Sequence, residues 1–323
     1  MNTALSNTLP FRREPTVAVI IPCYNEAAVI GKVVRDFRSV LPTASIFVYD
    51  NSSSDATCEE ALSAGAIVRT EGQVGKGNVV RRMFADVEAD VFVMIDGDDT
   101  YDAFLAPRLI EVLLANSLDM VNAVRVPTST KVYRRGHKFG NALLTWVVAT
   151  VFGGHVTDML SGYRAFSRRF VKSFPAVSSG FEIETELTVH ALELRLPVAE
   201  IPVRYKERSE GSKSKLKTYR DGILILRVIL RLIKEEKPLE FFGWIFVALA
   251  LSSVVLELPV ISVFIKTGFV PRIPTAILGV GIGILSFISL TCGLILDTVT
   301  RGRIEMKRMH YLSLGNRYAG SQD

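Results

Sequence analysis

Short apolar runs alternate with segments of helical periodicity through much of the chain. The apolar runs, which are rich in β-branched residues, are residues 16–22, 45–50, 66–70 and 90–96. Such runs are typical of buried strands. The segments between them that place apolar residues at helical spacing are residues 25–41, 52–65 and 75–87. Strands that alternate with helices predict an α/β fold with a mostly parallel sheet that is covered on both faces.

The pattern continues less regularly beyond residue 100. Residues 181–196 have the spacing of a helix, and residues 197–208 read as a strand that leads into a basic loop. Residues 139–154 are apolar but shorter than the roughly 20 residues that a membrane span needs, so we expect a core helix or one at a lipid surface.

The last third of the chain has a different pattern. Residues 219–240 place Arg220, Arg227, Arg231 and Lys234 on one face of a helix, with apolar residues around the rest. Such a basic amphipathic helix is typical of an anionic membrane surface, and the alternative is the solvated face of a core helix. Residues 241–265 and 273–296 are each long and apolar enough to cross a bilayer. We therefore predict a membrane protein.

Charge near the two spans predicts their orientation. Basic residues flank the outer ends of the pair at Lys237 and from Arg301 to Arg308, whereas the connecting loop holds Lys266 and Arg272. The positive-inside rule then places both termini in the cytosol, with a multi-pass hairpin in the cytoplasmic (inner) membrane. The first 15 residues lack the apolar core of a signal peptide and are expected to form a disordered polar lead, which also keeps the N-terminal part cytosolic.

Within the spans, Gly279 and Gly283 form a small-xxx-small pair that permits close helix packing, including packing between copies in a homo-oligomer. Glu257 lies inside the first span, where a charge is costly, so we expect it to be protonated or partnered. The three cysteines have no paired or metal-type spacing and are expected to be reduced thiols.

Composition adds one constraint. The net charge of +5 and pI near 9.1 suit nucleic acid, anionic lipid or phosphorylated substrates. Because the basic residues gather next to the apolar spans, we expect a membrane and anionic substrates as partners, and no nucleic acid.

Acidic residues crowd the end of the fourth predicted strand. Asp96, Asp98, Asp99 and Asp102 follow an apolar run, and like charges at this density repel unless a cation lies among them. Asp50 ends the second predicted strand. Ligands of open parallel sheets bind beyond the carboxyl ends of strands, so both positions fall at a binding crevice. Carboxylate oxygens with substrate phosphates suit Mg²⁺ or Mn²⁺; the alternative is a solvated acidic turn.

Six segments in order resemble one known family. They are "VIIPCYNE", "VYDNSSSDAT", "GKGNVVRRMF", "MIDGDDTYD", "DMLSGYRAFSRR" and "YKERSEGSKSKL", and they cover residues 19–216. The ordered set resembles family 2 glycosyltransferases with the GT-A fold, in particular the dolichol-phosphate mannose synthases and bacterial polyprenyl-phosphate glycosyltransferases. Relatives often read DADLQ where this chain reads DGDDT, so Thr100 takes the position of a glutamine.

The resemblance implies roles for individual residues. A nucleotide-sugar donor would contact Pro22, Tyr24, Glu26, Asp50, Gly75, Lys76 and Asp96. Asp96 and Asp98 would hold the metal, and the reaction centre would include Asp98, Asp158 and Arg164. The phosphate of a polyprenyl-phosphate acceptor would be approached by Arg134, Arg135, His137, Lys138, Arg204, Lys213 and Lys215. Basic residues are the appropriate type here, because both substrates are anionic and the leaving diphosphate gains charge.

The glutamates of "FEIETE" cannot all face the crevice, because Glu182 and Glu186 share one helical face. We assign none of them a catalytic role, and we predict that His190 is structural. The implied domains are a disordered lead (1–15), a catalytic GT-A domain (16–210), an acceptor loop with membrane-surface helices (211–240), a transmembrane hairpin (241–298) and a basic cytosolic tail (299–323).

The function implied is inverting, metal-dependent transfer of a sugar, with a UDP-sugar favoured, to a membrane polyprenyl phosphate. Two alternatives remain open at this point. A processive polysaccharide synthase normally carries a QxxRW-type motif, which this sequence lacks. A membrane-anchored scaffold that binds nucleotide without catalysis would bind the donor without turnover.

Overall fold

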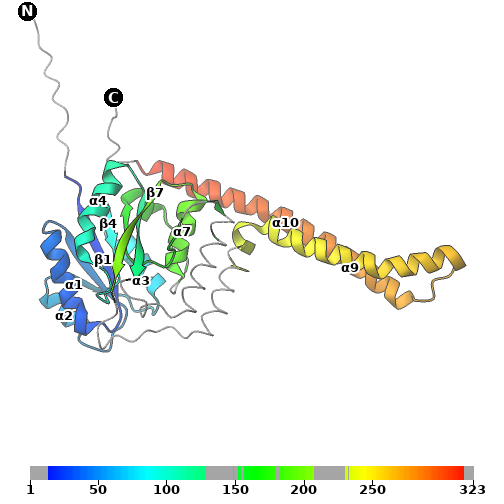
Figure 1. Cartoon of the computed structure of the whole chain (residues 1–323), viewed down its shortest axis with the longest axis horizontal. Helices are drawn as coiled ribbons and strands as arrows, with labels where there is room; N and C mark the ends of the chain where they lie inside the picture. Colours follow the sequence, from blue (N-terminus) through cyan, green and yellow to red (C-terminus); the bar gives the residue numbers. More distant parts are fainter. Residues whose placement is uncertain are drawn as a thin grey trace, which may run out of the picture.

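A seven-stranded mixed sheet forms the centre of the N-terminal domain (Figure 1). The computed structural model describes residues 14–127, 148, 152–153, 156–178, 180, 182–206, 230–231 and 233–315. The strand order is β3-β2-β1-β4-β6-β5-β7. The strands are β1 (Val17–Cys23), β2 (Ser45–Asp50), β3 (Ile67–Thr70), β4 (Val91–Met94), β5 (Met120–Pro127), β6 (Arg164–Ser167) and β7 (Val198–Tyr205).

The pairing is parallel among β1, β2, β3 and β4, and also between β5 and β7. Strand β6 lies between the two groups and runs antiparallel to β4 and β5. The predicted α/β fold with a mostly parallel sheet is confirmed. The helices are α1 (Ala27–Val40), α2 (Thr57–Ser63), α3 (Lys76–Asp86), η1 (Ala103–Leu105), α4 (Ala106–Ala115), α6 (Arg168–Ser173), α7 (Ile183–Glu193), α9 (Pro238–Thr267) and α10 (Ile273–Ser313).

Each face of the sheet has its own apolar core. Along β1, Val19 and Ile21 point to the face covered by α1, α2 and α4, whereas Ala18 and Ile20 point to the face covered by α3, α6 and α7. This alternation follows from the two-residue period of a strand. It explains why the strand is apolar at successive positions, since both of its faces are buried.

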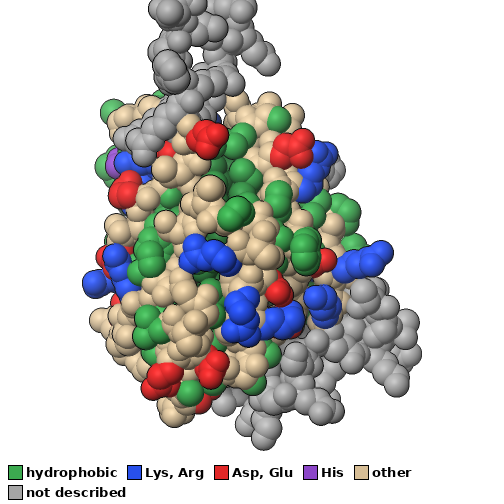
Figure 2. Space-filling view, turned by 90° about the vertical axis from the view of Figure 1, so that its left-hand side faces the viewer, with side chains coloured by type: hydrophobic (Ala, Val, Ile, Leu, Met, Phe, Trp, Pro, Cys, Tyr) green, Lys and Arg blue, Asp and Glu red, His purple; other side chains and the backbone are tan. Residues whose placement is uncertain are grey.

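His190, for which we predicted a structural role, is buried against the second core. Its ring packs edge-on against Phe170 and Phe174, and Nε2 lies 3.3 Å from the hydroxyl of Ser173. On the outside, the face turned away from the long C-terminal helices carries interspersed basic and acidic side chains (Figure 2). Such mixed charge is typical of a surface in contact with water.

Helices α9 and α10 pack against each other and project away from the sheet domain (Figure 1). Both are long and apolar enough to cross a membrane, and most of their apolar side chains lie exposed: Trp244 is 76% exposed and Ile265 is 77% exposed. In a water-soluble domain such a surface would be strongly unfavourable, whereas lipid chains cover it without cost.

Glu257 of the first apolar helix faces the second. A β-carbon on Gly279 would overlap its carboxylate, and the hydroxyl of Ser253 donates to the carbonyl of Gly279 at 2.8 Å. The glycine therefore makes room for a polar side chain inside the helix pair.

The second apolar helix continues beyond its apolar stretch. Residues 299–313, expected as part of a basic tail, continue α10 and run back along the sheet domain. Tyr311 joins the core beneath α6 and α7. Its hydroxyl donates to the fully buried Asp119 at 2.7 Å. Lys307 pairs with Glu193 of α7, also at 2.7 Å.

Candidate active site

The carboxyl ends of three neighbouring parallel strands meet at one edge of the sheet. Strand β1 ends at Cys23, β2 ends at Asp50, and β4 is followed within four residues by Asp96 and Asp98. The amide of Asn51 donates to the carbonyl of Cys23 at 2.8 Å, which ties the first two ends together. The residues that the sequence placed at a crevice are therefore brought together.

The edge is strongly electronegative. Burial raises the pKa of the Cys23 thiol well above its usual range, and nearby negative charges add to the effect. The carboxylates that act on this thiol are Glu26, Asp50, Asp96 and Asp98. Since a negative potential at one point opposes the loss of a proton there, these carboxylates make the surroundings of the Cys23 thiol favourable to positive charge.

Two of the four clustered aspartates, Asp99 and Asp102, make contacts that stabilise the loop after β4. Asp99, with a φ of 54°, pairs with Lys32 at 2.7 Å. Asp102 accepts a hydrogen bond from the amide of Phe104 at 3.0 Å and so begins the short helix η1. Their negative charge is thus offset locally, by a cation and by a helix N-terminus.

Asp98 is 5% exposed, and its Oδ1 accepts a hydrogen bond from the hydroxyl of Thr100 at 2.6 Å. Thr100 is itself fully buried. The residue that replaces the glutamine of the family pattern therefore orients the carboxylate of Asp98. The sequence signalled this residue only as a departure from the pattern.

Asp96 is held by a lysine. The ammonium of Lys76, at the start of α3, lies 2.5 Å from Asp96 Oδ1 and 2.5 Å from Glu184 Oε1. Burial acts to lower the pKa of Lys76, but the two carboxylates outweigh it and raise the pKa above its ordinary value. The other side of Asp96 faces Gly162, where a β-carbon would overlap the carboxylate.

The turn that carries Lys76 depends on glycine and on an asparagine. Gly75 has a φ of 132°, which side chains rarely allow. Its amide donates to Asn51 Oδ1 at 2.7 Å, and Asn51 Nδ2 donates to the carbonyls of Glu71 and Gln73. Asn51 was not singled out from the sequence, although it follows Asp50 directly in the "YDNS" motif.

The loop after β1 lies against the loop after β2. Pro22 sits within β1, Tyr24 is 40% exposed, and the amide of Glu26 donates to Thr57 Oγ1 at 2.9 Å. Asp50 is buried, and its Oδ2 accepts from the amide of Ser53 at 3.0 Å. The predicted donor residues thus line the same edge as the aspartates.

Asp158 forms a two-point ion pair that the sequence did not reveal. Both of its carboxylate oxygens lie 2.7 Å from the guanidinium of Arg125 in β5. Burial acts to raise the pKa of Asp158, but the hydrogen bonds and charge of Arg125 outweigh it and leave the pKa below its ordinary value. The carboxylate is therefore held ionised and is poorly suited to accept a proton.

Arg164 lies beneath the loop that contains Asp158. Its guanidinium is fully buried and donates to the carbonyls of Met159 and Ser161 and to the hydroxyl of Thr188. Burial lowers the pKa of this arginine. In this position Arg164 fixes the loop against α7 and does not present its charge to the crevice.

Part of the predicted acceptor site can be located. Arg204 is exposed near the end of β7. The other residues of that prediction lie outside the described residues; they are Arg134, Arg135, His137, Lys138, Lys213 and Lys215. The apolar segment 139–154 also lies almost entirely outside them.

The residues at the crevice fit a divalent cation. Asp96 and Asp98 supply hard oxygen ligands at a point where further carboxylates add negative potential. The carboxylate of Asp96 packs directly against Gly162, where any side chain would displace it. No group of three or more His, Cys, Asp or Glu side chains able to hold a metal occurs within the described residues, so water or substrate oxygens would complete the coordination.

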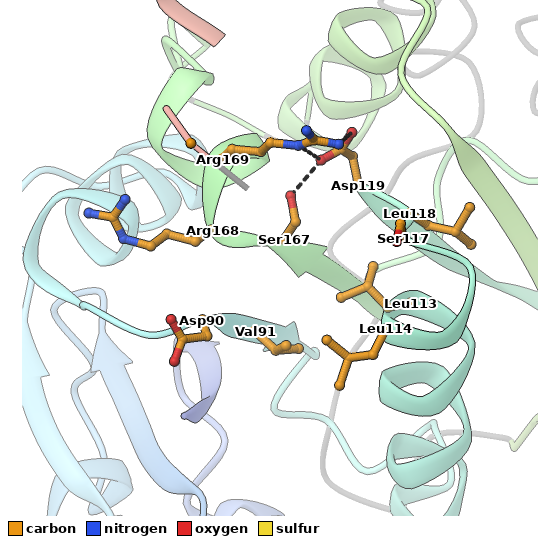
Figure 3. Close-up of a pocket in the computed structure, with 11 residues that line it drawn as sticks. Asp90, Val91, Leu113, Leu114, Ser117, Leu118, Asp119, Ser167, Arg168 and Arg169 are labelled. Carbon is orange, nitrogen blue, oxygen red and sulfur yellow. Dashed lines mark hydrogen bonds and ion pairs between the residues drawn. The ribbon is translucent and has the colours of Figure 1, made fainter. Parts of the chain in front are cut away.

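A separate pocket lies at the opposite edge of the sheet (Figure 3). Asp90 at the start of β4, Asp119 at the start of β5, and Ser167 with Arg168 and Arg169 line it. Asp119 is fully buried and pairs with Arg169 at 2.7 Å, so its charge is already balanced. We assign this pocket no role in the chemistry.

Comparison with known proteins adds the family context. Residues 18–174 match the family model described as Glycosyl transferase family 2. The chain is 33% identical to Glycosyltransferase AglJ of Haloferax volcanii, over 70% of this chain and 75% of that protein. It is 27% identical to a dolichol-phosphate mannosyltransferase of Pyrococcus furiosus, over 78% of each chain.

A solved structure supports the fold independently. The crystal structure of glucosyl-3-phosphoglycerate synthase from Mycobacterium tuberculosis, in complex with Mn²⁺, UDP-glucose and phosphoglyceric acid, superimposes with a TM-score of 0.56 at 23% identity. The match covers 68% of this chain and 79% of that one. The sheet domain therefore has the same fold as this enzyme.

Proposed function

The chain belongs to glycosyl transferase family 2, and on that premise we propose that it transfers a sugar from a nucleotide-sugar to a polyprenyl phosphate in the membrane. One observation carries the proposal: carboxylates gather at the carboxyl ends of neighbouring strands in a chain that continues into two exposed apolar helices. A similar chain is named a dolichol-phosphate mannosyltransferase, which supports this class of acceptor.

The donor is proposed to lie along the edge formed by β1, β2 and β4. Pro22, Tyr24, Glu26, Asp50 and Gly75 would contact the nucleoside and diphosphate, because their loops converge there. We favour a UDP-sugar, since a protein of the same fold was solved with UDP-glucose and Mn²⁺.

Asp96 and Asp98 would hold Mg²⁺ or Mn²⁺, and such an ion offsets the charge that develops on the leaving diphosphate. The chain's own residues do the rest. The hydroxyl of Thr100 holds the Asp98 carboxylate in place, and Gly162 leaves room for the carboxylate of Asp96 itself. Lys76 adds a positive charge within reach of the same region.

The bond changes need no strong general base. An oxygen of the acceptor phosphate attacks the anomeric carbon, while the bond from that carbon to the diphosphate oxygen breaks and its electron pair leaves with the diphosphate. The second pKa of a phosphate monoester is about 6, so the nucleophile is already ionised near neutral pH. Asp158, paired with Arg125, positions its loop and does not take up a proton.

The acceptor would arrive from the membrane side. In this proposal residues 16–210 bind the donor, residues 211–240 meet the acceptor at the membrane surface and residues 241–298 anchor the chain. Residues 299–323, the rest of the catalytic domain and the N-terminus lie in the cytosol. Arg204, together with Arg134, Arg135, Lys213 and Lys215, would contact the acceptor phosphate.

Incubation with labelled nucleotide-sugars, Mn²⁺ or Mg²⁺ and a short polyprenyl phosphate tests the proposal. We expect one donor to give a lipid that carries a single sugar, identified by mass, with no product when EDTA is present. A long polymer would indicate a processive synthase instead. Donor binding with no product from any donor would indicate a nucleotide-binding scaffold and would overturn the proposal.

A further inference from the structure

One ammonium group lies between two carboxylates that come from distant parts of the chain. Lys76 is in the first turn of α3, Asp96 follows β4, and Glu184 is in the first turn of α7. The side chains of Lys76 and Glu184 are 10% and 6% exposed. Charged groups this deeply buried interact strongly, because little water screens them.

The proposed metal ion would bind the same carboxylate of Asp96 that Lys76 contacts. Asp96 is one of the two residues proposed to hold the divalent cation, and its Oδ1 is already taken by the ammonium of Lys76. A divalent ion placed on Asp96 would repel the ammonium, since both are cations at the same carboxylate. The lysine and the metal are therefore expected to compete for Asp96.

We propose that Lys76 is a positioning residue that holds Asp96 until the metal arrives and is then kept by Glu184 within reach of the donor diphosphate. This inference rests on the proposed function. It assigns Glu184 the part of a permanent anchor for the lysine, and it couples the binding of metal to the binding of donor.

Glu184 has the capacity that this role requires. Its Oε1 accepts the ammonium, while its Oε2 is buried and has no hydrogen-bond partner among the described residues. An ammonium released by Asp96 can therefore turn toward Glu184 and remain paired. Without Glu184 the released charge would be buried alone, which is costly.

The test is a titration of the full-length, detergent-solubilised protein with Mn²⁺ in the absence of donor, following free Mn²⁺ by electron paramagnetic resonance. In Lys76→Met the competitor is gone, so Mn²⁺ should bind more tightly, by about tenfold. Binding of UDP in saturating Mn²⁺ should weaken by about tenfold, because a charge-assisted contact to the diphosphate is lost. Opposite changes in the two affinities are not expected if the lysine merely stabilises the fold.

Lys32 of α1, which pairs with Asp99 of the acidic turn, provides a matched control. It pairs with Asp99 at 2.7 Å and with Asp36 at 2.8 Å. Lys32→Met removes the same charge close to the crevice without touching Asp96. Its Mn²⁺ affinity should stay within about twofold of the wild-type value, because an exposed charge is screened by water.

A second variant keeps the lysine and should change the Mn²⁺ affinity in the opposite direction. Glu184→Gln leaves the ammonium with Asp96 alone and should weaken Mn²⁺ binding. In the double variant with Lys76→Met this effect should largely disappear, since the competitor is absent. Unchanged or weaker Mn²⁺ binding in Lys76→Met, or unchanged binding in Glu184→Gln, would overturn the inference while leaving the proposed function intact. Failure of the wild type to bind Mn²⁺ would instead contradict the metal dependence of the proposed function.

Discussion

The carboxylate of Asp98 is almost fully buried, and a buried hydroxyl from Thr100 orients it. Such a carboxylate is held in place before any ligand binds, so little ordering is needed when a cation arrives. The neighbouring Asp99 differs, because it is paired with the exposed Lys32. Two adjacent aspartates therefore have different tasks, and substitution can separate them.

We predict that Asp98→Asn lowers turnover by at least about a hundredfold while the protein stays folded, because an amide is a weak ligand for a hard divalent cation. The measurement is formation of lipid-linked sugar at fixed Mn²⁺, with thermal unfolding as a check on folding. Asp99→Asn is the control. Asparagine tolerates the positive φ at this position, so this variant should keep most of its activity. Full activity of Asp98→Asn at ordinary metal concentrations would contradict the assignment.

Site residues that are close in the sequence could be predicted to lie together, whereas residues brought together only by the fold could not. Asp96 and Asp98 are two positions apart after one strand, so their proximity follows from local pattern alone. Lys76 was assigned to the donor from its motif, but its pairing with Glu184 spans 108 residues and depends on how α3 and α7 cross the sheet. Arg125 and Asp158 are likewise joined only by tertiary structure, and no local signal marks Arg125.

Among the helices and strands, α10 has the most influence on how the parts of the molecule are held together. It begins in the apolar hairpin and ends against the sheet domain, where Tyr311 reaches Asp119 and Lys307 reaches Glu193. A second ion pair joins Arg303 to Glu236 at 2.7 Å, just before α9. Burial and the charge of Glu193 raise the pKa of Glu236 to about 7. Helix α10 is thus tied to the sheet domain through Tyr311 and Lys307, and to the segment before α9 through Arg303.

Tyr311→Phe is predicted to lower the free energy of unfolding by about 1.5–3 kcal/mol, the usual range for a hydrogen bond to a charged group. The ring of Tyr311, on which the guanidinium of Arg169 stacks at 4.7 Å, is retained in this variant. Denaturant unfolding of the solubilised protein measures the change. Ser313→Ala removes an exposed local hydrogen bond from the same helix end and should have little effect. Equal stability of Tyr311→Phe and wild type would show that the contact does not hold the helix.

The predicted elements agree best with the structure where the apolar pattern of the sequence coincides with burial. Strands β1 to β4 and helices α1, α3 and α7 lie within one to three residues of the ranges expected from the sequence. Strands β5 and β6 were not predicted. Strand β6 has only four residues and runs antiparallel within the "SGYRAFSRR" segment, where a functional motif obscures the apolar pattern. The full length of α10 was not predicted, because the basic residues after residue 298 indicated a tail. In the structure, Lys307 instead forms an ion pair with the sheet domain.

At the scale of the whole molecule, one long helix joins the apolar hairpin to the sheet domain. Helix α10 has 41 residues, about 60 Å at 1.5 Å per residue. Its apolar part can cross the bilayer, and the remainder lies along the domain (Figure 1). A domain attached in this way would meet a lipid phosphate at a fixed height and tilt.

Removal of residues 241–323 is therefore predicted to lower activity on long-chain acceptors in vesicles far more than activity on short, dispersed acceptors, by about tenfold or more in their ratio, because anchoring raises the local concentration of lipid. The truncated chain should also unfold at a lower temperature, since Asp119 and Glu193 lose their partners on α10. UDP binding in Mn²⁺ serves as the control for an intact crevice. Undiminished activity on long-chain lipid would contradict the anchoring role.

The central claim is that a divalent cation held by Asp96 and Asp98 bridges the donor diphosphate to the protein. Crystals of the full chain grown with Mn²⁺ and a UDP-sugar, with data collected at the manganese absorption edge, test it most directly. The account predicts a single strong anomalous peak within bonding distance of both carboxylates and of the diphosphate. An anomalous peak elsewhere, with Lys76 still seated on Asp96 and nucleotide bound, would contradict it.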